Sequence, residues 1–112
     1  MIGGAITTPE PDVAELLGML GFDWLWIDME HCPLDFKDAE TILQALGGST
    51  SAPIIRVPWN DPVYIKRALD LELAGVIVPW VNSWEEAEAA VRACLYPPEG
   101  IRGCGPRRAV PR

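Results

Sequence analysis

The segment WLWIDMEHC places two acids and an imidazole at the end of an apolar run. The run predicts a strand over residues 24–28, so Asp28, Glu30 and His31 fall where that strand meets its loop. A second apolar run ends in Arg56. Parallel α/β folds place their chemistry at the carboxyl ends of their strands, which share one edge of the sheet. The spacing therefore predicts a candidate active site built from these four residues.

These residue types suit proton transfer beside an anion. Histidine is the side chain whose unperturbed pKa lies near neutrality, and a neighbouring carboxylate such as Asp28 can orient the ring of His31 for a general-base role. A histidine that only caps the loop is the alternative. Arg56 could hold a carboxylate or a developing enolate oxygen through its planar fork. The alternative for this residue is a structural salt bridge to Asp28 or Asp61.

The cysteines indicate a reducing, cytoplasmic environment. Their number is odd and they form no C-x-x-C pair, which argues against a disulfide framework. Cys32 adjoins His31 and could be a nucleophile, but nothing in the sequence lowers its thiol pKa, so packing is favoured. The other two are Cys94 and Cys104.

Two tryptophans follow the expected third and fourth strands. Trp59 and Trp80 could form the wall of a small-molecule pocket near the same edge of the sheet, or they could pack in a core or an interface.

Apolar, β-branched segments alternate with helical patterns four times along the chain. The sequence predicts strands over residues 2–6, 24–28, 51–58 and 74–79. These strands barely alternate between apolar and polar residues, which is typical of a parallel sheet buried on both faces. We expect a single domain over residues 1–112, of the α/β class.

Helix signals follow each expected strand. The first helix should turn one apolar face inward and end at Gly21, and that face comprises Val13, Leu16, Leu17 and Leu20. Asp35 and Asp61 are expected N-caps of the second and third helices, the third running to about Leu71. Residues 83–86 form an expected capping box, before a fourth helix whose inward residues are Ala87, Ala90, Val91 and Cys94.

The pattern is typical of the (β/α)8 TIM-barrel family, although a four-stranded open sheet would give the same alternation. A complete barrel has eight units in about 250 residues. With about four βα units, the 112-residue chain corresponds to a half barrel, which suggests a fragment or a truncated gene product. Its first and last strands would then expose unpaired edges, to be covered by a partner or by the other half.

Composition excludes several classes of function. The formal net charge is −7, and no basic stripe suits a nucleic-acid backbone. The one basic cluster lies in a Gly- and Pro-rich tail that we expect to be a solvated loop, and it comprises Arg102, Arg107, Arg108 and Arg112. No basic leader and no membrane-length apolar run occur, so we expect a soluble protein with no nucleic-acid or membrane partner.

Four motifs together resemble the HpcH/HpaI aldolase/citrate lyase family over nearly the whole chain. They are GFDWLWIDMEH, IIRVPWNDP, GVIVPWV and YPPEGIRGCGPRRA. The resemblance implies the N-terminal half of a class II pyruvate aldolase, a metal-dependent carbon–carbon lyase with a (β/α)8 barrel. Its relatives cleave 4-hydroxy-2-oxo acids, such as 2-keto-3-deoxy sugar acids or 2,4-dihydroxyhept-2-enedioate, to pyruvate and an aldehyde.

The resemblance also implies roles for single residues. His31 matches the family's base, Asp28 its orienting partner, and Arg56 the arginine that binds the keto or enolate oxygen of the substrate. Glu30 matches an acid near the water shell of a divalent cation, which is Mg²⁺, Mn²⁺ or Co²⁺ and acts as a Lewis acid. The direct Glu and Asp ligands of that metal are expected beyond residue 112, at the fifth and sixth strands, so we expect none in this chain.

Two positions depart from the family pattern. Glu72 stands where a glycine normally ends the third helix, which predicts a strained left-handed turn. Ala5 stands where some relatives carry an aromatic residue, which leaves the preferred aldehyde open.

Two other interpretations remain open. One is a non-catalytic half barrel that pairs with another chain, and the other is a citryl- or acyl-CoA lyase relative. The full-length form of such an aldolase is expected to be a homo-oligomer.

Overall fold

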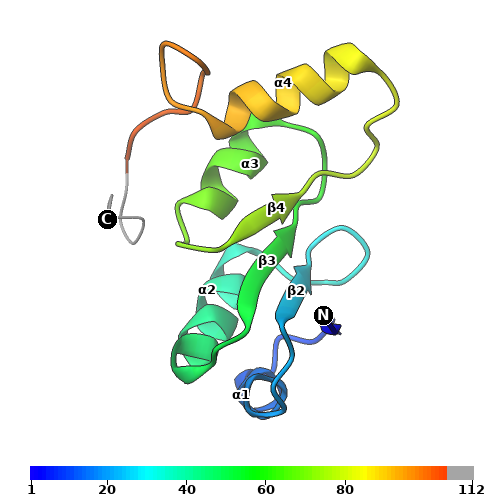
Figure 1. Ribbon diagram of the computed structural model, residues 1–112, viewed down its shortest axis with the longest axis vertical. Helices are drawn as coiled ribbons and strands as arrows, with labels where there is room; N and C mark the ends of the chain where they lie inside the picture. Colours follow the sequence, from blue (N-terminus) through cyan, green and yellow to red (C-terminus); the bar gives the residue numbers. More distant parts are fainter. Residues whose placement is uncertain (106–112) are drawn as a thin grey trace.

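A four-stranded parallel sheet with the strand order β1-β2-β3-β4 forms the centre of the molecule (Figure 1). The computed structural model describes residues 1–105. The strands are β1 (Gly3–Ile6), β2 (Trp24–Asp28), β3 (Ala52–Arg56) and β4 (Gly75–Ile77). The helices are α1 (Pro11–Met19), α2 (Phe36–Ala45), the short 3-10 helix η1 (Leu46–Gly48), α3 (Pro62–Leu69) and α4 (Trp84–Cys94). The predicted alternation of strands and helices in the α/β class is confirmed.

The register of the sheet sets the level at which each strand ends. Asp28 at the end of β2 is aligned with Arg56 of β3, and Arg56 is aligned with Ile77 of β4. Aligned residues on neighbouring parallel strands project toward the same face. The sheet alone therefore brings the predicted acid and the predicted arginine side by side.

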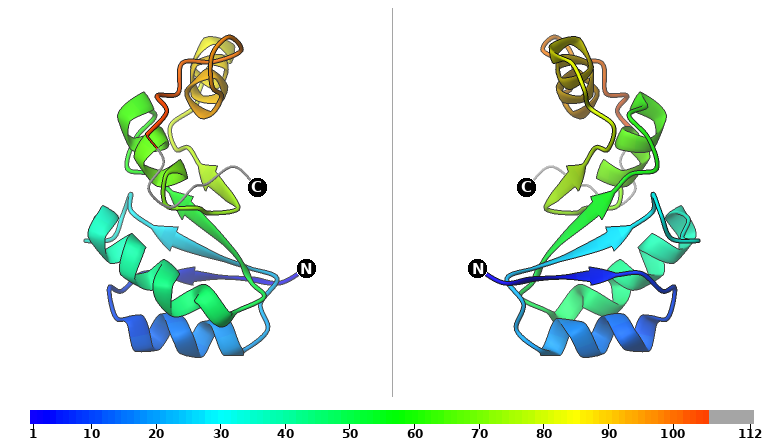
Figure 2. Two further views of the ribbon diagram at one scale, coloured as in Figure 1. Left: turned by 90° about the vertical axis from the view of Figure 1, so that its left-hand side faces the viewer. Right: turned by 90° about the vertical axis from the view of Figure 1, so that its right-hand side faces the viewer.

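The two faces of the sheet are covered differently. Helices α1, α2 and α3 lie on one side of it, and α4 packs against α3 (Figure 2). On that side Leu25, Ile27 and Ile55 are fully buried, and each such side chain stabilises the fold by about 2 kcal/mol. On the other side Trp26 and Ile54 are only half-buried. Among residues 1–105 no helix covers that second face (Figure 2).

The inward face predicted for α1 is largely wrong. Ala14 is buried and Leu17 packs against the core. The other three residues expected there, Val13, Leu16 and Leu20, are exposed. The helix instead turns a side with small residues inward, and a Cβ at Gly18 would come within 3.0 Å of Leu46. Periodicity finds an apolar stripe, but close packing through small residues decides which stripe faces the sheet.

Capping side chains begin three of the helices. Asp35 accepts hydrogen bonds from the backbone N–H groups of Lys37 and Asp38 and forms a complete capping box, while Asp61 accepts one from Val63, as predicted. At α4 only half of the expected box is present. Ser83 Oγ accepts from the N–H of Glu86, but the Glu86 carboxylate accepts from the N–H of Asn82 instead of Ser83.

The predicted inward face of α4 is partly wrong. Ala90 is buried as expected, whereas Val91 is exposed and the neighbouring Ala93 is buried in its place. Ala87 and Cys94 are half-buried. The helix packs on α3, and its buried residues are the small Ala90 and Ala93.

Two non-glycine residues have left-handed backbones. Glu72 has φ +63°, which confirms the strained turn predicted where the family has glycine. Trp80, just after β4, has φ +59° and was not predicted. α3 ends at Leu69, slightly before the expected Leu71.

Arg102 does not lie in a solvated loop as predicted. Its side chain is 11% exposed, donates to Asp70 at 2.9 Å and stacks over the ring of Tyr96. The rest of the basic cluster, Arg107, Arg108 and Arg112, lies outside the described residues.

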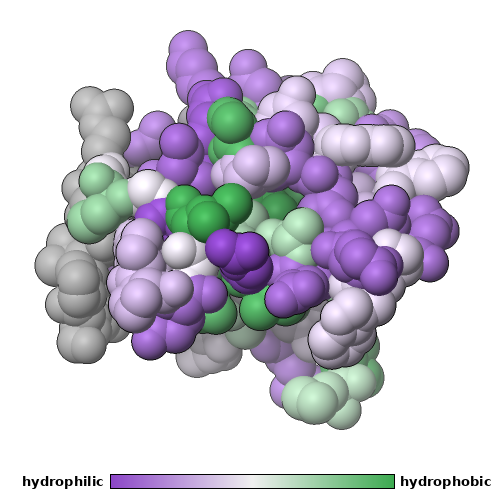
Figure 3. Space-filling model, turned by 90° about the horizontal axis from the view of Figure 1, so that it is seen from above, coloured by the Kyte–Doolittle hydropathy of each residue, from purple (hydrophilic) through white to green (hydrophobic). Residues whose placement is uncertain are grey.

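The surface carries apolar groups among charged ones. Seen from the α4 end, it is largely hydrophilic with hydrophobic groups near its centre (Figure 3). Within residues 1–105, no helix combines the length and the apolar character needed to span a membrane.

Candidate active site

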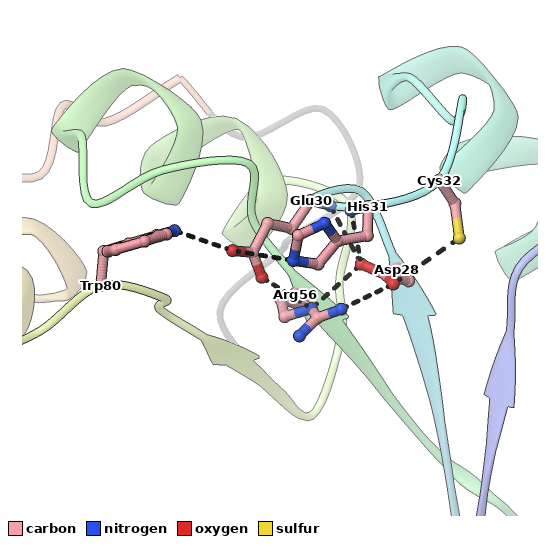
Figure 4. A network of polar contacts seen from close by, with 6 residues as sticks. All are labelled: Asp28, Glu30, His31, Cys32, Arg56 and Trp80. Atoms are coloured by element: carbon pink, nitrogen blue, oxygen red, sulfur yellow. Dashed lines mark hydrogen bonds and ion pairs between the residues drawn. The ribbon is translucent and has the colours of Figure 1, made fainter.

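Asp28 and Arg56 form a bidentate pair across the ends of β2 and β3 (Figure 4). Arg56 Nε donates to Asp28 Oδ1 at 3.0 Å, and Nη2 donates to Oδ2 at 2.7 Å. Two parallel charge-assisted bonds fix the direction of both side chains. The salt bridge to Asp28 that the sequence left open is present, whereas Asp61 caps α3 instead.

Asp28 also shapes the loop that follows β2. Its Oδ1 accepts the backbone N–H groups of Glu30 at 3.0 Å and His31 at 3.3 Å. The residue is 4% exposed. The hydrogen bond from Arg56, opposed by burial and aided by the two backbone bonds, lowers the pKa of Asp28 from 3.8 to about 2. Asp28 is therefore a carboxylate at neutral pH.

Glu30 connects three side chains of the site. Its carboxylate is 9% exposed, and Oε2 lies 3.1 Å from Arg56 Nε. Its Oε1 accepts from the indole Nε1 of Trp80 at 3.0 Å and lies 3.5 Å from Nε2 of His31. Figure 4 shows this contact between the imidazole of His31 and the carboxylate of Glu30. Asp28 contacts only the backbone of His31 by hydrogen bonding, and the expected orienting contact with the ring is not formed.

His31 and Arg56 differ in accessibility. The His31 side chain is 72% exposed, so a small molecule can reach its imidazole directly. Arg56 is 21% exposed and its guanidinium lies 4.4 Å from the centroid of the Trp26 ring. The ring fixes the guanidinium from the uncovered face of the sheet and contributes a cation–π contact.

Cys32 lies beside this network. Its Sγ is 3.6 Å from Asp28 Oδ2, and burial, followed by the negative charge of Asp28, raises the pKa of the thiol. A raised pKa disfavours the thiolate, which is the nucleophilic form. The packing role favoured from the sequence fits this environment better than the nucleophilic one.

The sequence did not reveal the bond from Trp80 to Glu30. Trp59 and Trp80 do lie near the site, with ring centroids 5.8 Å apart. The sequence does show an indole N–H just after β4, which could have indicated a donor near the site. The direction of that N–H depends on the left-handed backbone at Trp80, which the sequence does not indicate. Trp26 was likewise not identified as the ring beneath Arg56.

The described residues do not by themselves form a metal centre. Among residues 1–105 no group of three or more His, Cys, Asp or Glu side chains could hold a metal ion. Both oxygens of Asp28 already accept from Arg56, while Glu30 forms an ion pair with Arg56 and accepts from Trp80. With two carboxylates and one guanidinium, this group of side chains carries a net negative charge at neutral pH.

Four parallel strands that alternate with helices form half of an α/β barrel, and ionisable side chains lie at the carboxyl ends of two of its adjacent strands. The model of the HpcH/HpaI aldolase/citrate lyase family matches residues 6–110. The chain belongs to this family.

Relatives and solved structures agree with that assignment. The chain is 50% identical over 102 residues to 2-dehydro-3,6-dideoxy-6-sulfogluconate aldolase of Pseudomonas putida, covering 91% of this chain and 40% of that protein. It is 53% identical over 93 residues to 5-keto-4-deoxy-D-glucarate aldolase of Escherichia coli, covering 83% and 36%. A family protein from Burkholderia cenocepacia J2315 superposes with a TM-score of 0.88 at 35% identity, covering 93% of this chain and 43% of that one. The chain thus spans less than half the length of these relatives.

Proposed function

We propose that this chain provides the acid–base and arginine part of an aldolase site that cleaves a 4-hydroxy-2-oxo acid to pyruvate and an aldehyde. The segments of two sugar-acid aldolases that align with this chain are 50% and 53% identical to it. The observation that carries the proposal is the exposed imidazole of His31 beside the linked carboxylates and guanidinium of Glu30, Asp28 and Arg56.

His31 acts as the base in this proposal. Cleavage of the bond between C3 and C4 requires that the 4-hydroxyl group lose a proton, while the electron pair of the broken bond forms the enolate of pyruvate. The exposed imidazole of His31 can accept that proton, and the Glu30 carboxylate, 3.5 Å from Nε2, stabilises the imidazolium that results. The same proton can then be returned to the enolate carbon.

Arg56 holds the oxygen on which the negative charge develops. Asp28 takes two of its donors and thereby fixes the plane of the guanidinium, so the remaining N–H groups have a defined direction. A fixed donor directed at a developing oxyanion stabilises the transition state more than the ground state. In this proposal Asp28 fixes the position of Arg56 and of the loop that carries His31.

A divalent cation is part of the proposed chemistry, although the described residues do not hold one. Mg²⁺, Mn²⁺ or Co²⁺ would polarise the keto group as a Lewis acid when bound. The net negative charge near Asp28 and Glu30 favours a cation over a free carboxylate substrate.

A fused protein gives the direct test. We would join this chain to the later part of the Escherichia coli 5-keto-4-deoxy-D-glucarate aldolase and supply 5-keto-4-deoxy-D-glucarate with each of the three cations. Pyruvate would be followed by its reduction with lactate dehydrogenase. We expect pyruvate formation that a chelator abolishes, and the 112-residue chain alone shows how much it catalyses without further strands.

Two controls connect the activity to this chain. Exchange of the methyl protons of pyruvate with deuterium oxide needs the enolate but no aldehyde, so it tests the site without the full substrate. A fused protein that is folded by circular dichroism but forms no pyruvate and exchanges no protons with any of the cations contradicts the proposal. That result favours the non-catalytic half barrel.

A further inference from the structure

Trp80 reaches the candidate active site from a strand that supplies no other residue to it. The residue follows β4, and its indole Nε1 donates to Glu30 Oε1 at 3.0 Å in the loop after β2 (Figure 4). This bond connects parts of the chain that the β3 strand separates. It is a hydrogen bond from a neutral donor to a carboxylate, which is stronger than a bond between neutral groups.

The backbone around Trp80 is fixed by contacts that direct the indole. Its φ of +59° is left-handed, which costs about 1–2 kcal/mol for a residue with a Cβ. Asn82 Nδ2 donates to the carbonyl of Trp80 at 2.9 Å. The N–H of Asn82 in turn donates to Glu86 Oε2 at 2.6 Å, in the first turn of α4. The strained residue is thus held between β4 and the start of a helix.

Glu30 needs such a support because Arg56 is shared. Arg56 Nε lies 3.0 Å from Asp28 Oδ1 and 3.1 Å from Glu30 Oε2, so two carboxylates approach one N–H. Asp28 accepts a second hydrogen bond from Nη2, whereas Glu30 contacts the guanidinium as an ion pair through the shared Nε. Repulsion between the two acids acts on the less firmly held one, which is Glu30. A second donor on Glu30 Oε1 opposes its movement into solvent.

The neighbouring indole offers a matched comparison. Trp59 packs on Trp80 with ring centroids 5.8 Å apart and planes at 32°, and both rings are more than half exposed. Within residues 1–105, only Trp80 of this pair bonds to Glu30. A role that depends on ring surface involves both residues, while a role that depends on the N–H involves Trp80 alone.

We propose that Trp80 is a positioning residue: its indole N–H holds the Glu30 carboxylate between Arg56 and His31. This positioning role depends on two contacts, the hydrogen bond from Trp80 Nε1 to Glu30 and the ion pair between Glu30 and Arg56. Its consequence for catalysis rests on the proposed function, since Glu30 faces the imidazole that acts as the base.

Nuclear magnetic resonance of the ¹⁵N-labelled chain tests the geometry without any activity. The probe is the Nε–Hε signal of Arg56, which senses whether Glu30 Oε2 is in place. We expect Trp80→Phe to shift this signal in the same direction as Glu30→Ala, because both changes remove the carboxylate from Arg56. Trp59→Phe, the matched control, should leave the signal where it is.

Three results overturn the proposal. An Arg56 signal that Trp80→Phe does not move shows that Glu30 stays in place without the indole. An equal shift in Trp59→Phe shows that ring packing alone is responsible. Should Trp80→Phe fail to fold, Glu30→Ala is examined at the indole signals instead. A shift at Trp80 and none at Trp59 supports the bond, and an unmoved Trp80 signal overturns it.

Activity of the fused protein provides a separate readout. Residues that orient a site through another residue change activity by about 10- to 100-fold when they are removed. We expect Trp80→Phe to lower kcat by this factor with little change in KM, and Trp84→Phe, an exposed ring at the start of α4, to leave kcat at the parent value. Loss of kcat in both variants contradicts the role of Trp80. An inactive parent protein contradicts the proposed function, while the resonance measurement still decides the geometry.

Discussion

Arg56 and Asp28 meet through two bonds, at 3.0 and 2.7 Å, across the aligned ends of β3 and β2. Both side chains are largely buried, so neither charge has full access to water as a substitute partner. The pair therefore links the ends of the two strands. Because Asp28 also accepts from the backbone of the following loop, the pair helps to fix the position of that loop.

Replacing Asp28 should make the free energy of unfolding depend less on pH in the acid range. The carboxyl has a pKa of about 2 in the folded state against 3.8 in the unfolded chain, because Arg56 donates to it. A lowered folded-state pKa stabilises the protein above pH 3.8 by about 2 kcal/mol, and this contribution is lost as the pH falls toward about 2. Urea denaturation measures the free energy of unfolding of the native chain and of Asp28→Asn. The difference between the two should shrink as the pH falls from 3.8 toward about 2.

Glu88→Gln is the control for that measurement, because Glu88 is an exposed residue of α4. Its free energy of unfolding should follow that of the native chain at each pH. A difference between Asp28→Asn and the native chain that stays constant down to about pH 2 contradicts the assigned pKa.

Removing the guanidinium should be more harmful than exchanging it for another cation. Arg56→Ala leaves the buried Asp28 without its partner, and the loss of one member of a buried pair costs about 3–5 kcal/mol. Arg56→Lys keeps the charge but cannot form both bonds, so it should fall between the native chain and Arg56→Ala. Thermal or urea denaturation of the native chain and the two variants gives the order of their stabilities.

Arg67→Ala is the matched control for the arginine variants. Arg67 is exposed and lies 4.0 Å from the centroid of the Phe36 ring, so its removal should cost about 0.5–1 kcal/mol. Equal losses in Arg56→Ala and Arg67→Ala would show that the Asp28 pair adds nothing to stability.

The strands and caps were predictable because they follow from local rules. Apolar runs ending in Asp28 and Arg56 gave β2 and β3, and Asp35 and Asp61 gave the starts of α2 and α3. The adjacency of the acid and the arginine follows from this parallel order. The position of Glu72 in a left-handed turn was also predictable, through the glycine expected there.

The parts that were not predictable depend on packing between distant segments. The inward side of α1 is determined by how closely Gly18 approaches Leu46, which periodicity does not contain. The ion pair of Arg102 with Asp70 depends on where the chain returns after α4. The bond from Trp80 to Glu30 depends on a backbone angle of one residue.

Glycine at position 72 should stabilise the fold. Glu72 has φ +63°, where a Cβ costs about 1–2 kcal/mol and glycine adopts the angle without strain. Because glycine also loses more entropy on folding and cannot make the interaction of the Glu72 side chain, we expect a net gain smaller than the strain, about 0.5 kcal/mol, in Glu72→Gly. The control Glu88→Gly, in the interior of α4, should lose about 1 kcal/mol. Denaturation curves in which both variants lose stability contradict the expected relief of strain.

Cys32 should react slowly with alkylating reagents. Burial and the charge of Asp28 raise the pKa of its thiol, which lowers the fraction of reactive thiolate. Cys104 is exposed and serves as the internal control in the same chain. Mass spectrometry after timed treatment with iodoacetamide should show modification of Cys104 before Cys32. Faster modification of Cys32 would indicate an activated thiol and restore the nucleophilic interpretation.

Replacing His31 should separate activity from stability. The side chain is 72% exposed, so His31→Asn should leave the free energy of unfolding close to that of the native chain. The proposed base lowers the barrier by proton transfer, and its loss from the fused protein should reduce pyruvate formation by about 10²–10⁴-fold. Lys37→Ala is the control, because an exposed lysine on α2 has no part in this mechanism, and it should retain the parent rate. A folded His31→Asn protein that cleaves its substrate at the parent rate would exclude His31 as the base, and the proton acceptor would then have to be another group near Glu30.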